Sequence, residues 1–283
     1  MLMQIYRSLD EVVEAGTIAS DSIVNADCLE AMKFIPDKSI DCIICDLPYG
    51  VTACKWDELI PFEPLWEQYK RIVKPNGAIV LFGSQPFTSA LVMSNPKWFK
   101  YEWVWEKEQG VGFQLAKYRP LLKNESCLVF SKGTPKYYPQ KTPLIKPKIV
   151  KRNINSNGMS KTSPIKYSEK RISIYTFKTP DNFLKFNRER GLHSTQKPVK
   201  LIEYLAKTYT LENEIIVDNT AGSGTLAIAC INTNRRYICI EKDPEYFDVM
   251  KYRIENHDPN ALATPKKARK PKAIPEGQLR LFG

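Results

Sequence analysis

The sequence predicts an α/β fold whose mostly parallel sheet carries helices on both faces. Short apolar runs alternate with longer amphipathic stretches, which is the pattern of strands joined by crossover helices. Four of the apolar runs end in or are followed by an acidic residue, at Asp27, Asp46, Asp218 and Glu241. Ligands of an open parallel sheet bind at the carboxyl ends of its strands. We therefore expect one binding crevice along that edge of the sheet.

The alternation can be followed along the chain with one interruption. Proline and glycine mark most boundaries, as at Pro36 and at Pro75-Asn76-Gly77. Pro198 is expected inside the first turn of a helix, where proline is favoured. Residues 51–60 are expected to form a mobile loop beside the site. The expected strands are 22–27, 40–45, 78–82, 98–105, 125–131, 214–218 and 236–241, and the expected helices are 29–35, 64–73, a segment after Pro86, 195–210, 223–232 and 244–256.

The composition is that of a globular protein. Of 283 residues, 43% are hydrophobic and 26% are charged, which fits one large domain or two small ones. No stretch approaches about 18 apolar residues and the start lacks a signal-peptide pattern, so no membrane span is expected. Seven scattered cysteines are typical of a reduced cytoplasmic protein. Cys42 and Cys45 would point to opposite faces of a strand, so we expect core residues and no metal site.

Positive charge is concentrated in two segments. The chain has a net charge of +11, and residues 133–192 carry fourteen Lys and Arg against three Asp and Glu. Residues 257–283 carry six against two, which leaves 22 basic and 26 acidic residues in the rest. A mildly acidic body with a basic insert and a basic tail favours a polyanionic partner. A solvated, lysine-rich loop is the alternative for the insert.

The first motif, Asp46-Leu47-Pro48-Tyr49, follows the apolar run 40–45. A carboxylate beside an aromatic ring and a stiff backbone can hold a flat ring by stacking while it accepts a hydrogen bond from an amine. The alternative is a turn that ends a strand with a helix-capping aspartate, and a short motif by itself does not exclude it.

The second motif, Asp218-Asn219-Thr220-Ala221-Gly222-Ser223-Gly224-Thr225, lies between an expected strand and an expected helix. Glycines there let the backbone approach a ligand closely, and the amino end of the helix favours negative groups. Glu241 follows Gly222 by nineteen residues, a spacing at which an acidic residue commonly holds ribose hydroxyls. Ala227 stands where a dinucleotide site has its third glycine, so a nucleoside other than NAD is favoured.

Together the two motifs resemble those of the DNA amino-methyltransferases that use S-adenosylmethionine. The order of catalytic motif, insert and cofactor motif is similar to that of their β group, over about residues 22–256. The resemblance implies a Rossmann-like methyltransferase sheet in two halves. The catalytic half would be 1–132, the target-recognition insert 133–192, the cofactor half 193–256 and the flexible tail 257–283.

The resemblance also implies roles for individual residues. Glu241 would bind the cofactor ribose, and Asp27, next to Cys28, would accept from the adenine amine of the cofactor. Thr195 and Lys197 lie in a segment that resembles the family's helix start near the cofactor carboxylate, so both are candidate partners of that group. The pocket for the methionine part would be shaped by Asp218, Gly222 and Gly224. Further candidate cofactor-binding residues in the same motif are Asn219, Ala221 and Ser223.

The same resemblance implies the chemistry of the first motif. The Asp46 side chain and the Leu47 carbonyl would accept hydrogen bonds from the amine of a flipped base, on the rigid frame of Pro48, while Tyr49 stacks on the base. Asp at the first position favours adenine N6 over cytosine N4. Three residues depart from the family pattern, since Leu47 and Ser194 each replace a Pro and Thr220 replaces a frequent Phe. The backbone role of position 47 should tolerate leucine.

The insert and the tail suggest contacts with macromolecules. The insert is expected to read the recognition sequence in double-stranded DNA, with its lysines on phosphates. The end of the tail resembles the peptide by which bacterial proteins dock on the sliding clamp, and a non-specific basic arm is the alternative. That peptide would contribute Gln278, Leu279, Leu281 and Phe282.

Other functions stay open at the level of sequence. Related motifs occur in enzymes that methylate RNA or protein glutamine, and the long basic insert favours DNA over both. A DNA-binding regulator on a degenerate methyltransferase fold is a different class, which the intact motifs argue against. The resemblance allows a homodimer and implies a bacterial or phage-encoded, cytoplasmic enzyme.

Overall fold

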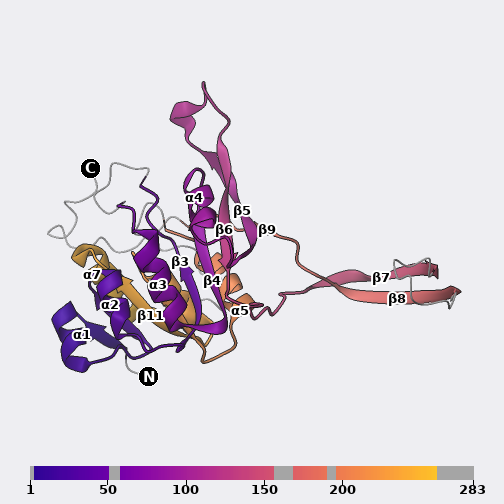
Figure 1. Ribbon diagram of the computed structural model, residues 1–283. Coiled ribbons are helices and arrows are strands. Elements are labelled where there is room, and N and C mark those ends of the chain that lie inside the picture. Colours follow the sequence, from indigo (N-terminus) through magenta and orange to yellow (C-terminus); the bar gives the residue numbers. More distant parts are fainter. Residues whose placement is uncertain (1–2, 51–57, 156–167, 190–195, 260–283) are drawn as a thin grey trace.

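A nine-stranded sheet forms the centre of the computed structural model, which describes residues 3–50, 58–155, 168–189 and 196–259 (Figure 1). Every neighbouring pair is parallel except the two pairs that β6 makes, with β4 and β5, so the expected mostly parallel sheet is confirmed. The strands, in spatial order, are β1 (Gln4–Tyr6), β2 (Ser22–Asn25), β11 (Arg236–Glu241), β10 (Ile215–Asp218), β3 (Ile40–Cys45), β4 (Val73–Gly83), β6 (Leu122–Phe130), β5 (Phe99–Val111) and β9 (Phe183–Lys185).

Helices cover both faces of the sheet. The first face is packed by the helices of the amino-terminal half, and the second by those of the carboxyl-terminal half. Within the described residues, no helix is both long and apolar enough to cross a bilayer. The first set is α1 (Leu9–Ala15), α2 (Cys28–Ala31), α3 (Phe62–Ile72) and α4 (Phe87–Ser94), and the second is α5 (Val199–Tyr209), α6 (Thr225–Asn232) and α7 (Pro244–Glu255).

Strand β3 shows how the sheet builds two cores. Its residues are fully buried, and from Cys42 to Cys45 alternate side chains enter opposite clusters, as the period of two requires. Cys42 packs in the cluster under α5 and α6, whereas Cys45 packs in the cluster under α3 and α4. The expectation that these two cysteines are core residues on opposite faces is therefore confirmed.

Two local predictions differ from the structure. Strand β1 and helix α1 were not expected, although Ser8 with Glu11 three residues later is a recognised signal of a helix start. The Glu11 amide donates to the hydroxyl of the N-cap Ser8 over 3.4 Å, and the Glu11 carboxylate accepts from the amide of the preceding Arg7 over 2.7 Å. Helix α5 begins at Val199, so Pro198 precedes the first turn instead of lying within it.

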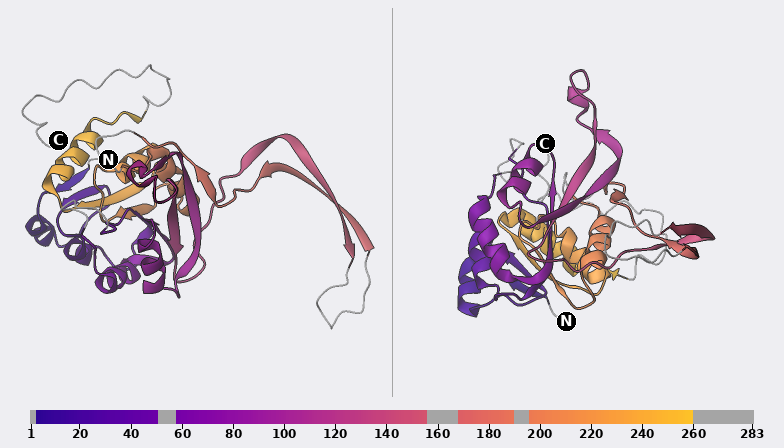
Figure 2. Two further views of the ribbon diagram at one scale, coloured as in Figure 1. Left: turned by 90° about the horizontal axis from the view of Figure 1, so that it is seen from above. Right: turned by 45° about the vertical axis from the view of Figure 1, so that its right-hand side comes forward.

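The basic insert forms a two-stranded antiparallel arm, β7 (Thr142–Asn155) with β8 (Ser168–Lys178), that stands away from the body (Figures 1 and 2). No strand was expected there. The end of β6 lies beside the starts of β4 and β5, and β9 runs parallel to β5. Both connections to the arm therefore leave the sheet at the edge formed by the amino ends of its parallel strands.

The β5–β6 hairpin projects from the opposite edge. Its tip, residues 112–121, contains a short 3-10 turn at Phe113–Leu115 and rises above the body (Figures 1 and 2). Because β5 runs parallel to β4 in direction, with β6 antiparallel between them, the tip lies on the side where the parallel strands end. The hairpin and the arm therefore leave the sheet at opposite edges.

Candidate active site

The two sequence motifs meet at the centre of the sheet. Strands β3 and β10 are paired through Ile216 opposite Cys42 and Val217 opposite Ile43. Asp46, which follows β3, and Asp218, which ends β10, consequently lie at the same edge. Glu241 ends the next strand, β11, and Asp27 follows β2 beyond it. The acidic strand ends thus converge, as the α/β topology predicts.

A cavity of about 810 Å³ opens at this edge, within the range of roughly 300–1,000 Å³ for small-molecule sites. Gly224 lies outside its lining as the N-cap of α6, with a φ of 76°. Thr195 and the loop segment 51–57 lie outside the described residues, whereas residues 58–60 line the cavity. The expected site residues that line it are Asp27, Cys28, Asp46, Leu47, Pro48, Tyr49, Lys197, Asp218, Asn219, Ala221, Gly222, Ser223 and Glu241.

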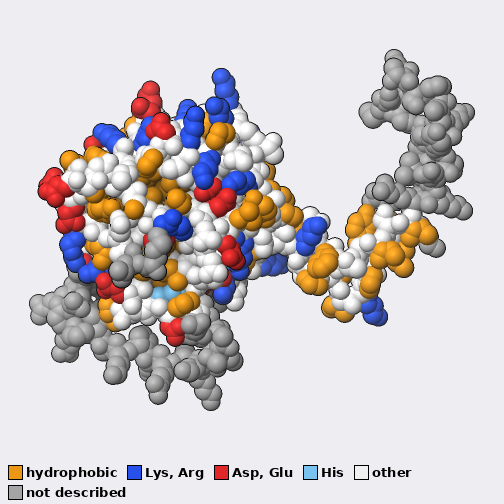
Figure 3. All heavy atoms as spheres, turned by 90° about the horizontal axis from the view of Figure 1, so that it is seen from below, with side chains coloured by type: hydrophobic (Ala, Val, Ile, Leu, Met, Phe, Trp, Pro, Cys, Tyr) orange, Lys and Arg blue, Asp and Glu red, His pale blue; other side chains and the backbone are white. Residues whose placement is uncertain are grey.

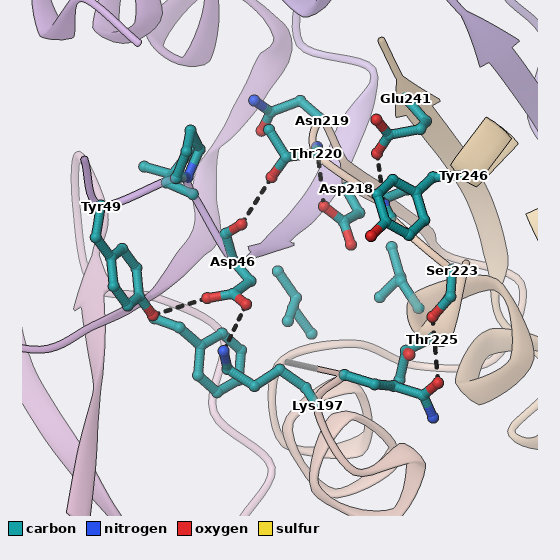
Figure 4. A pocket seen from close by; sticks show the side chains of 18 of the residues that line it. Asp46, Tyr49, Lys197, Asp218, Asn219, Thr220, Ser223, Thr225, Glu241 and Tyr246 are labelled. Carbon is teal, nitrogen blue, oxygen red and sulfur yellow. Dashed lines mark hydrogen bonds and ion pairs between the residues drawn. The ribbon is translucent and has the colours of Figure 1, made fainter. Parts of the chain in front are cut away.

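Asp46 is held from three directions (Figure 4). One carboxylate oxygen accepts a hydrogen bond from the Tyr49 hydroxyl at 2.7 Å, and the other accepts from the Lys197 ammonium. Its backbone carbonyl accepts from the Thr220 hydroxyl at 2.9 Å. Thr220 belongs to the second motif, so this last contact ties the first motif directly to the second.

Two buried residues that the sequence did not single out complete this end of the site. Glu125, at the start of the buried part of β6, pairs with Lys197 at 2.9 Å and with Lys107 at 2.8 Å. The Tyr49 hydroxyl also lies 2.8 Å from Glu125, so its one proton is shared between two carboxylates. The signal in the sequence is an acidic residue two positions before the apolar run 127–130, since a buried carboxylate is rare unless it is paired.

This cluster keeps its charges balanced. Burial by itself would raise the pKa of Glu125, but the ammonium groups of Lys197 and Lys107 lower that pKa to about 2. Burial also raises the pKa of Asp46, and Lys197 opposes that shift. Burial would lower the pKa of Lys197, yet Asp46 and Glu125 hold it above its usual value. Two cations therefore face two carboxylates.

Tyr49 and Leu47 occupy distinct environments beside Asp46. The Tyr49 ring stacks on Phe87 with centroids 5.0 Å apart, and its hydroxyl points at the carboxylates. The Leu47 side chain is 3% exposed and lies in the core under α3 and α4. An apolar residue suits this position, which accounts for leucine in place of the expected proline.

The other end of the cavity presents backbone amides and acidic groups. The Glu241 carboxylate accepts from the Gly222 amide at 2.7 Å and from the Asp243 amide at 2.9 Å, which fixes it at the end of β11. Gly222 has a φ of 51°, and a side chain there would meet no atom within 4 Å. The backbone at Gly222 is therefore open to a ligand in the cavity.

Asp218 and Asn219 are buried polar residues whose side chains can still interact with a ligand. Burial raises the pKa of Asp218 to about 7, and the nearby Asp46 and Glu241 add to the shift. The Asn219 side-chain oxygen accepts from the Tyr69 hydroxyl at 2.6 Å, whereas its buried amide nitrogen has no partner among the described residues. A cationic ligand would stabilise the ionised form of Asp218.

Two expected cofactor residues have other contacts in the structure. Lys197, expected at the cofactor carboxylate, instead directs its ammonium to Asp46 and Glu125. Asp27 caps α2 by accepting from the Leu29 amide at 2.9 Å, and its other carboxylate oxygen lies 3.5 Å from the Lys242 ammonium. Near the start of α6, the Ser223 hydroxyl contacts Gln196 at 3.2 Å.

This fold and this pair of motifs define a class, the S-adenosylmethionine-dependent amino-methyltransferases. The chain belongs to the N6/N4 DNA methylase family, whose model, described as "DNA methylase", matches residues 40–252. It transfers methyl groups from S-adenosylmethionine to exocyclic amines of DNA bases.

Individual relatives agree with this assignment. The chain is 26% identical to the type II methyltransferase M.HpaI of Haemophilus parainfluenzae, over 83% of this chain and 74% of that one. It is 25% identical to the DNA adenine methyltransferase YhdJ of Escherichia coli, over 87% of both. The crystal structure of an M1.HpyAVI–SAM complex superposes with a TM-score of 0.56 at 27% identity, covering 82% of this chain and 98% of that one.

The residues present in the cavity fit this cofactor. S-adenosylmethionine carries a sulfonium and an ammonium, and the cavity offers Asp218 and Glu241 to positive groups. The open backbone at Gly222 and the buried amide of Asn219, for which the described part of the chain provides no partner, are further groups that a bound ligand can satisfy. What the bound cofactor supplies is an electrophilic methyl group.

Proposed function

We propose that this enzyme methylates the N6 amine of adenine in duplex DNA, at a base withdrawn from the helix into the cavity. The observation that carries the proposal is the place of Asp46, a half-buried carboxylate at the wall of a cavity that also reaches the acidic cofactor end. The relative YhdJ is a DNA adenine methyltransferase, which supports adenine as the target base. Cytosine N4 is the second candidate.

The proposed chemistry follows from the hydrogen-bonding groups. The amine of a base is a poor nucleophile because its lone pair is delocalised into the ring. The Asp46 carboxylate and the Leu47 carbonyl would accept hydrogen bonds from its two N–H groups, which favours a tetrahedral nitrogen whose lone pair is no longer delocalised into the ring. Once the methyl group is attached, the nitrogen would release one of its protons to water. As positive charge develops on nitrogen, the same acceptors bind more strongly, so they stabilise the transition state more than the ground state. Tyr49 would present its ring to the base.

Identification of the methylated base tests the proposal. DNA from cells that express the chain should contain N6-methyladenine at one sequence, and DNA from cells that carry the Asp46→Ala variant should not. Enzymatic digestion followed by mass spectrometry of the nucleosides separates N6-methyladenine from N4-methylcytosine. N4-methylcytosine alone would contradict the choice of base, and no methylated base would contradict the proposal itself.

We further propose that the arm reads part of the recognition sequence. A two-stranded ribbon fits the major groove, and the segment 133–192 has the excess of positive charge described above. Lys148 and Tyr175 lie opposite each other on one face of the ribbon, whereas Ile149 and Ile174 form an exposed apolar pair on the other. Hydrophobic side chains gather along the described part of the arm (Figure 3). Exchange of residues 133–192 for those of a relative with a different site should change the methylated sequence.

Three further proposals concern partners and location. Docking on the sliding clamp rests on Gln278, Leu279, Leu281 and Phe282, which lie outside the described residues. A homodimer is favoured by the exposed isoleucines of the arm, Ile149 and Ile174 at 61% and 65%. Sedimentation of the purified chain, alone and with a bacterial sliding clamp, tests both. The DNA substrate suggests a place in the cytoplasm of a bacterium.

A further inference from the structure

The tip of the β5–β6 hairpin carries two strongly exposed aromatic rings. Phe113 is 80% exposed and Tyr118 is 85% exposed, although neither belongs to the cavity. Exposed Lys117 and Arg119 lie beside them, and residues 112–123 contain no acidic residue. Large exposed apolar groups with a consistent charge around them are typical of an interaction surface.

This tip is a defined structure held by its own hydrogen bonds. The Leu115 amide donates to the Gly112 carbonyl over 2.9 Å, and the Arg119 amide donates to the Leu115 carbonyl over 3.0 Å. Gly112 has a φ of 87°, a conformation that glycine adopts readily. A side chain on Gly110 would lie 2.6 Å from the Leu121 Cβ, so the two strands approach closely just below the tip. The aromatic rings are thus presented by a fixed turn.

The hairpin is continuous with the wall of the active-site cavity. Lys107 and Val111, on the rising strand, line the cavity, and Lys107 pairs with Glu125 inside it. At about 3.3 Å per residue, the tip lies roughly 20 Å beyond Lys107. The arm, in contrast, leaves the sheet at its other edge. Of these two projections, the hairpin is the one that rises directly from the cavity.

We propose that the hairpin tip enters the DNA duplex beside the target base and that Phe113 and Tyr118 fill the space that the withdrawn base leaves. A two-stranded ribbon fits the major groove, which is about 12 Å wide. Aromatic rings stack on bases of any identity, so the insertion needs no particular sequence. Lys117 and Arg119 then meet phosphates. This inference rests on the proposed withdrawal of the base into the cavity.

The positive charge of the hairpin tip favours DNA over a second copy of this chain as its binding partner. The only charged side chains of residues 112–123 are positive, so two copies would repel each other tip to tip. A duplex offers negative phosphates together with stacked bases, which match the cations and the rings respectively.

The test compares two duplexes that contain the methylated sequence. In one the target base is paired, and in the other the nucleotide opposite it is abasic, so the target base has no pair to break. The Phe113→Ala/Tyr118→Ala variant should methylate the paired duplex about 30-fold more slowly than wild type in single turnovers. It should stay within threefold of wild type on the abasic duplex and in its affinity for S-adenosylmethionine. Tyr252→Ala removes a 64% exposed ring from α7 as the matched control and should leave both rates unchanged.

Each other outcome overturns the inference. Equal rates of variant and wild type on the paired duplex would show that the rings are not needed. Equal losses on both duplexes would assign them to binding or folding instead of to opening the pair. A changed sedimentation coefficient of the variant without DNA would assign the tip to contact between copies. A wild-type enzyme that methylates neither duplex would instead contradict the proposed function, which separates the two failures.

Discussion

Replacement of Asp46 by Asn is expected to lower the rate of methyl transfer by about 10²–10³-fold, the range for loss of one preorganised transition-state group. The amide keeps the shape of the side chain but loses the negative charge that stabilises the positive charge developing on the amine nitrogen. It also weakens the bond from Lys197, because an amide oxygen is a weaker acceptor than a carboxylate. Single-turnover methylation of the target duplex measures the effect.

Affinity for S-adenosylmethionine should change little in this variant, because Gly222 and Glu241 line the other end of the cavity. Asp37→Asn is a suitable control, since Asp37 is an exposed partner of Arg71 outside the cavity. A fall in cofactor affinity that accounts for the whole loss of rate would assign Asp46 to the cofactor instead of to the base.

Replacement of Lys197 by Met is expected to make the reaction strongly dependent on pH. In the wild type, Lys197 opposes the effect of burial on the pKa of Asp46. Without that ammonium, burial and the neighbouring Glu125 raise the pKa of Asp46 further. A protonated Asp46 no longer carries the charge that the transition state needs, so the rate at neutral pH should fall more than tenfold. It should recover as the pH rises through the raised pKa.

The partners of Lys197 provide the controls. Removal of one member of a buried ion pair costs about 3–5 kcal/mol of unfolding free energy, so the double variant Lys197→Met/Glu125→Gln should be more stable than Lys197→Met alone. Lys200→Met removes a neighbouring lysine that is 57% exposed, and it should leave the pH profile unchanged. A loss of rate that is independent of pH would contradict the role of Lys197 in setting the ionisation of Asp46.

Strongly patterned parts of the fold could be predicted from the sequence. The central strands contain short buried apolar runs next to prolines, glycines or acids, such as 40–45, 78–82 and 215–217, and these local signals do not depend on distant partners. Residues 142–155 and 168–178 carry no such signal, because a two-sided ribbon in solvent needs no alternation of apolar and polar side chains. Their strands depend on pairing with each other.

The site divides in the same way. Asp46, Asp218 and Glu241 could be found because each follows a strand whose end has a known place in a parallel sheet. Glu125 and Lys107 lie on the antiparallel pair β5 and β6, whose order in the sheet the sequence does not reveal. The contact of Lys197 with Asp46 joins residues 151 positions apart, and only the folded chain specifies it.

The adjacency of β3 and β10 has a consequence for the order of the catalytic and cofactor segments along the chain. The cavity requires these two strands side by side, but nothing in their parallel pairing requires the catalytic segment to precede the cofactor segment along the chain. A circular permutant whose new ends lie in the arm, with the old ends joined by a linker, would keep every strand of the central sheet. The same pocket can therefore be encoded in either order.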